Sequence, residues 1–257
     1  MSTKLEYVEP GHRWSNANFR VVRQIVLACI ATVVGGPMLL FLYIFKREAL
    51  MSILKYASVE SIKKQPKYQD KTLWQRVWDS PVGQLYLKGG LEYQLREGYC
   101  MPSTLRNILR SIPTISSDAI PPAKAAPSTA DNYATKIDAI GYTTSRVVYG
   151  SDGYEAFVEA LQHANDPQYR VAVNFLRSPI FGAGAPWFLP HNLLLALVGG
   201  HFSFVVGYLP DEDLVAVFDV NHTYGPFLVP TRRLFNAVSA HDLQSGKSRA
   251  LVVSKLK

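Results

Sequence analysis

The longest hydrophobic stretch of the chain covers residues 24–45 and contains no formally charged residue. At about 1.5 Å of rise per helical residue, a stretch of this length crosses the roughly 30 Å hydrocarbon core of a bilayer. Basic residues flank it on both sides, namely Arg20, Arg23, Lys46 and Arg47. The pattern predicts one transmembrane helix over residues 24–45, after an N-terminal flank of residues 1–23.

A cleaved signal peptide and a buried core helix are the alternatives to this anchor. The stretch is longer than the apolar region of a signal peptide, and no small-x-small cleavage site follows it. The basic residues on its two sides nearly balance, with a slight excess after the stretch. We therefore expect a single-pass membrane protein with its C-terminal domain on the cytosolic side.

Residues 46–80 are polar and have the pattern of a partly helical juxtamembrane stalk, interrupted at Pro66. Trp74 and Trp78 are four residues apart and so share one face of a helix. That face can contact the membrane surface or the domain that follows, and packing against the domain is the favoured interpretation.

Residues 81–257 alternate between helical and strand patterns and predict an α+β catalytic domain, with helices first and a mostly antiparallel sheet second. The expected helices cover residues 101–112, about 131 onward, 153–164 and 231–238. The expected strands cover residues 144–149, 170–176, 201–209, 214–220 and 249–254. Residues 210–213 form the turn of a hairpin, and residues 113–130 are rich in Pro, Ser and Ala and read as a loop.

Charge and cysteine content limit the function. Most of the net charge of +7 arises in residues 1–80, which hold 12 Lys/Arg against 6 Asp/Glu, whereas residues 81–257 hold 15 against 14. A near-neutral domain does not support binding to nucleic acid, while the basic excess beside the apolar stretch suits anionic lipid headgroups. The only cysteines are Cys29, inside the apolar stretch, and Cys100, so no disulfide framework forms and a reducing compartment is favoured.

Cys100 stands at the start of a predicted amphipathic helix, where unpaired backbone amides and the helix dipole favour a thiolate. His201 begins one strand of the predicted hairpin and Asp219 nearly ends the other. If the turn holds an odd number of residues, the two side chains share a face, and the carboxylate can orient the imidazole as a base for the thiol. Gln94, six residues before Cys100, is a candidate oxyanion donor.

Each of these residues also has an ordinary structural interpretation. A cysteine at a helix start is often a small buried apolar residue, and a histidine opening a strand is often part of the core. An aspartate at a strand end commonly accepts hydrogen bonds from a turn. The remaining histidines lack the spacing of metal ligands and are expected on the surface.

Around these residues the sequence resembles the phytochelatin synthases, a papain-like transpeptidase family. The matching stretches are Gln94 through Cys100, the Gly-Gly-His-Phe-Ser block through Tyr208, Asp219-Val220, and Gln244 through Arg249. Ser80 through Gly90 is also similar. The likeness covers roughly residues 80–257.

The resemblance implies a papain-like fold and a Cys–His–Asp triad that attacks glutathione at its Cys–Gly bond. Cys100 would be the nucleophile, His201 the general base and acid, Asp219 the orienting carboxylate and Gln94 the oxyanion donor. The γ-glutamylcysteinyl group would pass to a second glutathione, giving phytochelatin, or to water. No cofactor is required by the protein, and heavy-metal ions such as Cd or Zn enter as metal–glutathione thiolate substrates.

The sequence departs from the family pattern at several places. Met101 stands where a glycine is usual, and His222 where an arginine is usual. The segment 178–198 is long and apolar, and its part 186–198 is expected to form an extra buried helix or, alternatively, a lid or membrane-facing patch. The cysteine-rich C-terminal region of plant members is absent. A papain-like peptidase on other peptides and a catalytically silent, membrane-tethered binding protein are therefore the alternative functions.

Overall fold

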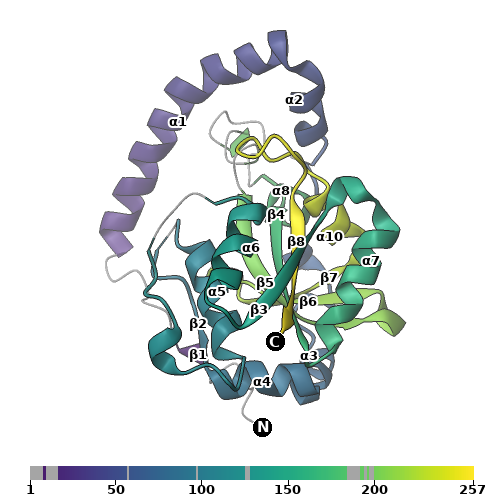
Figure 1. Cartoon of the computed structure of the whole chain (residues 1–257). Helices are drawn as coiled ribbons and strands as arrows, with labels where there is room; N and C mark the ends of the chain where they lie inside the picture. The colour runs from purple at the N-terminus through teal and green to yellow at the C-terminus, as the bar shows by residue number, and fades with distance from the viewer. Residues whose placement is uncertain are drawn as a thin grey trace.

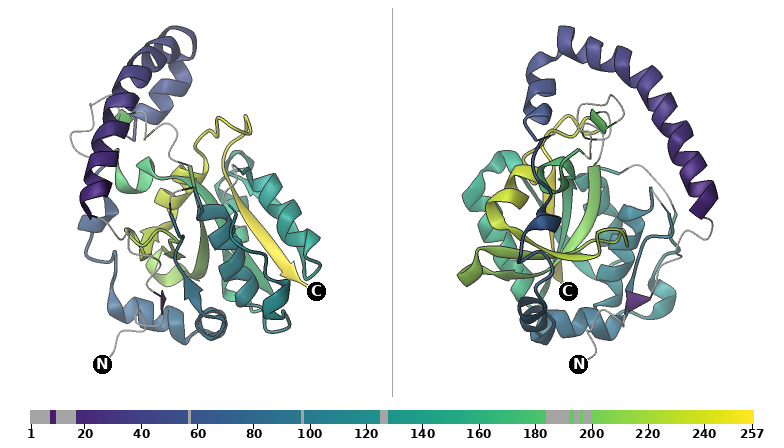
Figure 2. Two further views of the ribbon diagram at one scale, coloured as in Figure 1. Left: turned by 90° about the vertical axis from the view of Figure 1, so that its left-hand side faces the viewer. Right: turned by 180° about the vertical axis from the view of Figure 1, so that it is seen from behind.

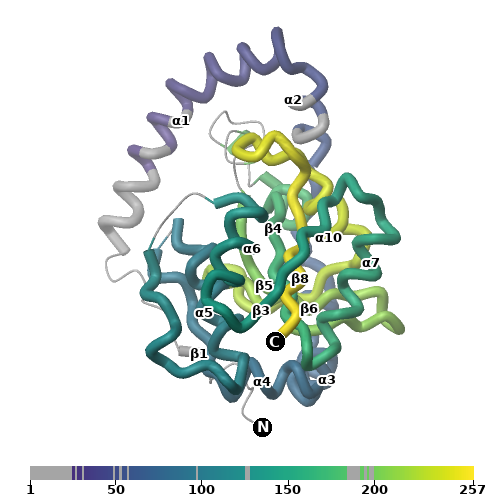
Figure 3. Tube along the Cα trace, viewed as in Figure 1, coloured from purple at the N-terminus to yellow at the C-terminus, as the bar shows by residue number. Residues whose placement is uncertain are grey.

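The computed structural model describes residues 8–9, 17–56, 58–96, 98–124, 128–183, 192–193, 196 and 200–257. Its centre is a six-stranded, wholly antiparallel sheet with the strand order β3-β8-β4-β5-β6-β7 (Figure 1). The strands are β3 (Thr143–Tyr149), β4 (Tyr169–Leu176), β5 (Gly200–Leu209), β6 (Leu214–Phe218), β7 (Pro226–Pro230) and β8 (Ala250–Leu256). The C-terminal strand β8 inserts between β3 and β4, as the chain trace shows (Figure 3).

Helices cover both faces of the sheet, because its central strands are apolar on both sides. In β4, Ala172 packs into one hydrophobic cluster, here the first core, while Val171 and Val173 pack into another, the second core. The helices of the first core are α3 (Lys71–Asp79), α4 (Pro81–Gly89), α5 (Cys100–Arg110) and α6 (Ala130–Ala139). Those of the second are α7 (Tyr154–Gln162), α8 (Ser178–Phe181) and α10 (Thr231–Val238).

The mixed α+β class is confirmed, but the expected order of helices first and sheet second is wrong. Helices α7, α8 and α10 lie between strands along the chain, because the second face of the sheet also has to be buried. The predicted helices and strands are otherwise present within a few residues of their expected ends. The sequence pattern missed β7, which is five residues long and has a proline at each end, a composition that argues against a strand.

Short elements complete the fold. A two-residue parallel ladder joins β1 (Val8–Glu9) to β2 (Leu91–Glu92). Single 3-10 turns are η2 (Ile62–Lys64), η3 (Ser117–Ala119), η4 (Gly150–Asp152), η5 (His163–Asn165) and η6 (Pro210–Glu212).

The N-terminal helix α1 (Ala17–Phe45) extends along the outside of the domain (Figure 2). Among the described residues, Ala28–Phe45 is the one helical window long and apolar enough to cross a membrane, with a mean hydropathy of 2.1 and 6% of its residues buried. Helix α2 (Arg47–Leu54) follows and places Leu50 against Leu176 at the end of β4.

The second half of the expected stalk is part of the packed domain. In α3, Trp74 and Trp78 are buried in the first core with their ring centroids 5.1 Å apart. The favoured interpretation, that the face with Trp74 and Trp78 packs against the domain, is therefore confirmed. Asp70 caps α3, and Ser80 caps α4 immediately afterwards, so the two helices meet at a tight corner. Packed structure therefore begins well before residue 81.

We predict that Trp78→Ala lowers the free energy of unfolding of the whole domain by roughly 3–5 kcal/mol, because it empties a large buried site. Lys71→Ala, on the exposed face of the same helix, is the control and should change stability by less than about 0.5 kcal/mol. Urea unfolding in detergent, followed by circular dichroism, measures both. Equal midpoints for the two variants would show that α3 is independent of the domain.

Candidate active site

Cys100 is the first residue of helix α5, and its side chain packs at the edge of the first core. Helix α5 is amphipathic, and its residues Met101, Leu105, Ile108 and Leu109 anchor it against the sheet. No side chain caps its N-terminus. The positive end of the helix dipole is thus directed at the sulfur, which favours the thiolate.

A β-bulge brings His201 and Asp219 to one face of the sheet. The turn between Leu209 and Leu214 holds four residues, an even number, and such a hairpin alone would put the two side chains on opposite faces. The register shifts by one residue at Val206, and this extra residue in β5 restores the parity. His201 and Asp219 therefore become diagonal neighbours across β5 and the end of β6. The condition of an odd turn is not met, yet the bulge brings the two residues together.

His201 and Asp219 form a short hydrogen bond in a buried setting. His201 Nε2 lies 2.6 Å from Asp219 Oδ1, and the two residues are 4% and 0% exposed. The same carboxylate oxygen accepts the backbone N–H of Asn221 at 2.7 Å, which fixes its position. Because Nε2 is directed at the carboxylate, Nδ1 is the ring nitrogen left for the sulfur of Cys100.

The electrostatics favour a charged thiolate–imidazolium pair. Burial by itself raises the pKa of the Cys100 thiol, but the charge and hydrogen bond of His201 and the backbone amide of Phe202 outweigh it, so that the pKa lies below its usual value. Burial likewise opposes the charge on His201, while Asp219 and Cys100 stabilise it and raise its pKa to about 9. Both shifts favour the form with the proton on the imidazole over the neutral pair.

Gln94 is buried, 4% exposed, and its backbone N–H donates to the carbonyl of Val220 at 2.7 Å. This bond ties Gln94 to the residue after Asp219. Among the described residues, no hydrogen-bond partner occupies its side-chain oxygen. Its role as oxyanion donor stays a prediction.

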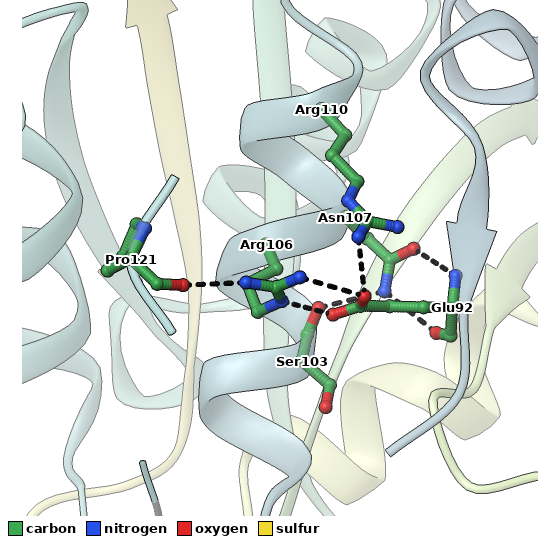
Figure 4. Close-up of polar contacts among 6 residues, drawn as sticks. All are labelled: Glu92, Ser103, Arg106, Asn107, Arg110 and Pro121. Atoms are coloured by element: carbon green, nitrogen blue, oxygen red, sulfur yellow. Dashed lines mark hydrogen bonds and ion pairs between the residues drawn. The ribbon is translucent and has the colours of Figure 1, made fainter. Parts of the chain in front are cut away.

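A polar network fixes the segment before Gln94 to helix α5 (Figure 4). The Asn107 amide accepts from the backbone N–H of Glu92 and donates to its carbonyl, both at 2.9 Å, and also donates to the Ser103 carbonyl at 2.8 Å. The Glu92 carboxylate binds Arg106 at 2.5 Å and Arg110 at 2.9 Å. Glu92 is two residues from Gln94, and Cys100 starts the same helix. The network thus sets the spacing between the nucleophile and the candidate oxyanion donor.

Arg249 is a buried cation beside the site to which the sequence pattern assigned no role. Its NH1 donates to Asn174 Oδ1 at 3.0 Å, and its NH2 lies 3.6 Å from Asp242 Oδ1. A Cβ at position 200 would collide with the guanidinium of Arg249. Gly200, directly before His201, therefore leaves room for this group. Burial lowers the pKa of Arg249, while the charges of Asp242 and Cys100 raise it. Arg249 ends the family-like stretch from Gln244, the one signal that could have singled it out.

The other residues named from the sequence are less central. Met101 is buried in the first core, while His222 lines a separate pocket. His163 stacks against Tyr169, and His241 is exposed. His12, His191 and most of the apolar segment 184–198 lie outside the described residues. Within the described part of the chain, no three His, Cys, Asp or Glu side chains gather in the manner of metal ligands.

Cys100, His201 and Asp219 form one chain of contacts, in the arrangement that enzymes with a nucleophilic cysteine use. A family model described as phytochelatin synthase matches residues 129–251, and it confirms the family that the motifs indicated. The match in general terms supports a glutathione γ-glutamylcysteinyltransferase-like function. His201 and Asp219 lie inside the match, whereas Cys100 and Gln94 precede it. No curated protein matches the sequence.

We predict that Cys100, in a Cys29→Ala background, is alkylated by iodoacetamide with a pH midpoint below the value of about 8.5 for a free thiol. In addition, His201→Ala should move the midpoint above that of the free thiol, because burial then acts unopposed. Mass spectrometry of the labelled protein measures both rates across pH. An unchanged midpoint in His201→Ala would disprove the pairing.

We also predict that Asn107→Ala lowers kcat about 10-fold or more with little change in KM, because the two backbone groups of Glu92 lose their partners and the Gln94 segment shifts. Asn132→Ala, on the exposed side of α6, is the matched control and should leave both constants unchanged. Steady-state rates of glycine release from glutathione provide the readout. A loss in Asn107→Ala that appears in KM alone would contradict the positioning role.

Proposed function

We propose that the chain is a membrane-anchored, papain-like acyltransferase that cleaves the Cys–Gly bond of glutathione through a thioester on Cys100. The observation that carries the proposal is the buried His201–Asp219 hydrogen bond, with the Cys100 thiol in contact with the same imidazole. The family match over residues 129–251 supports glutathione as the substrate.

In the first half-reaction, the Cys100 thiolate attacks the carbonyl carbon of the Cys–Gly bond. The electron pair moves to the carbonyl oxygen, and the Gln94 side chain donates a hydrogen bond to this oxyanion. As the intermediate collapses, the C–N bond breaks and the His201 imidazolium gives its proton to the departing glycine nitrogen. A γ-glutamylcysteinyl thioester on Cys100 and free glycine result.

In the second half-reaction, neutral His201 takes a proton from the attacking nucleophile. With the amine of a second glutathione, a new peptide bond forms, the C–S bond breaks and Cys100 leaves as a thiolate, which gives phytochelatin. With water, γ-glutamylcysteine is released instead. Asp219 keeps the imidazole in the orientation that both proton transfers require. Metal ions such as Cd or Zn take part as thiolate complexes of the substrate.

Helix α1 supports the proposed anchor by its length, its apolar composition and its exposure in the structure. We place the catalytic domain on the cytosolic side, where a reducing environment keeps Cys100 as a thiol. The helical part that presents the nucleophile and the antiparallel sheet that presents His201 and Asp219 support a papain-like arrangement.

The full chain in detergent should release glycine from glutathione, and Cys100→Ser should abolish the release, because a hydroxyl at this position is a far weaker nucleophile. Gln94→Ala should lower kcat by about 10²- to 10³-fold, the usual effect of removing an oxyanion donor. Chromatographic assay of glycine measures both.

Two further results separate the alternatives. Cleavage of an α-glutamyl peptide at the same rate as its γ-glutamyl isomer would favour a general peptidase. Undiminished glycine release by Cys100→Ser would exclude the proposed thioester route.

A further inference from the structure

The segment that leads from the membrane helix into the domain binds the loop that follows Asp219. Tyr68 donates its hydroxyl to the Tyr224 carbonyl at 3.0 Å, and its own carbonyl accepts the N–H of Leu228 at 2.8 Å. Gln69 bonds the Pro226 carbonyl at 3.0 Å. The segment thereby runs along the edge strand β7 (Figure 2, right). Tyr68 and Gln69, which lie outside the family match, therefore form part of the surface beside the site.

A pocket of about 360 Å³ lies between this segment and the loop. Its lining consists of Lys63, Tyr68, Gln69, Tyr93, His222, Thr223, Tyr224, Gly225 and Pro226. Three tyrosines with a cation, an amide and an imidazole form a lining that is aromatic and polar together. Such a lining suits a small peptide with a charged end rather than an apolar ligand.

Lys63 is the cation of this pocket, and its ammonium retains donors for a ligand. One N–H bonds the Thr223 carbonyl at 3.0 Å, and the group stands 4.7 Å from the centre of the Tyr224 ring. An ammonium has three donors, so two remain. Within the described part of the chain no carboxylate pairs with Lys63, whereas nearby Lys64 and Lys67 are each paired with a glutamate. Burial lowers the pKa of Lys63, and a partly desolvated cation gains most from an anionic partner.

The pocket adjoins the catalytic residues on the side of Asp219. The carbonyl of Gly225, in the pocket lining, accepts the backbone N–H of Asp219 at 3.1 Å, which places the pocket beside the catalytic carboxylate. The charge of Asp219 also acts on Lys63, Tyr68 and Tyr93. Tyr93 stacks on Phe218 and directly precedes Gln94. The pairing with His201 offsets part of the negative charge of Asp219.

We propose that this pocket binds the C-terminal carboxylate end of a small thiol peptide, with Lys63 as the cation that pairs with it. The inference rests on the proposed function, under which this end is the glycine of glutathione. In the proposed reaction the glycine nitrogen receives its proton from His201. The pocket lies next to Asp219, the residue that orients His201. The residues from the membrane-side segment thus select substrates that end in a free carboxylate.

The test is a binding measurement on the full chain with Cys100→Ala, which cannot form the thioester. Glutathione and its C-terminal glycine amide are titrated by calorimetry against this protein with and without Lys63→Gln. The amide lacks only the carboxylate. We expect Lys63→Gln to weaken glutathione binding roughly 10- to 100-fold, as for the loss of one charge-assisted hydrogen bond, and to leave the affinity for the amide unchanged.

Lys64→Gln is the matched control, because Lys64 is the next residue, is exposed and faces Glu60. It should leave both affinities unchanged, and Lys63→Arg should restore part of the preference for glutathione over the amide. Equal loss for both ligands in Lys63→Gln, or equal affinities for them in the unsubstituted pocket, would overturn the proposal. Glycine release by the chain with Cys100 intact is scored separately, so that a failure of the proposed reaction is distinguished from a failure of the pocket.

Discussion

The hydrogen bond between His201 Nε2 and Asp219 Oδ1 is the constraint on which the site depends. Both residues are buried, so an unpaired charge on either would be costly, and each is stabilised by the other. The bond fixes which ring nitrogen faces Cys100 and holds a proton on the imidazole. The charge of the imidazolium in turn offsets the burial that would otherwise keep the thiol neutral.

The backbone of the domain is arranged around this bond. The bulge at Val206 sets the parity of β5, and the backbone N–H of Asn221 holds the carboxylate from the other side. Gln94 is tied to Val220, one residue after Asp219, while Asn107 ties the same segment to the helix that starts at Cys100. The nucleophile and the candidate oxyanion donor are six residues apart, whereas the imidazole comes from a distant part of the chain, and these hydrogen bonds fix their relative positions.

Local patterns in the sequence predicted most of the elements, because amphipathic spacing and strand alternation are local properties. The helix at Cys100 and the hairpin of His201 and Asp219 were predicted in this way. The bulge was not, because a one-residue shift of register leaves no composition signal. The short strand β7 was hidden by its prolines. The hydrogen bonds of Arg249 and Lys63 join residues far apart along the chain, and periodicity does not report such contacts.

The segment between helix α1 and the domain has a polar pattern that indicates a partly helical stalk, with packing of its two tryptophans as the favoured interpretation. The tryptophans do fill the first core, and the backbone of the segment also bonds the edge strand β7. From Tyr68 onward this segment is consequently packed structure rather than a loose linker. The end of β4 that contacts α2 at Leu50 also lies next to the start of β5, where His201 stands.

Trapping the covalent intermediate tests the central claim most directly. The full chain is mixed with glutathione, quenched in acid and digested, and the peptide that contains Cys100 is examined by mass spectrometry. We expect a mass increase of one γ-glutamylcysteinyl group on Cys100, lost when Asp219 is replaced by alanine. Release of glycine with no such adduct on Cys100, or with the adduct on another residue, would contradict it.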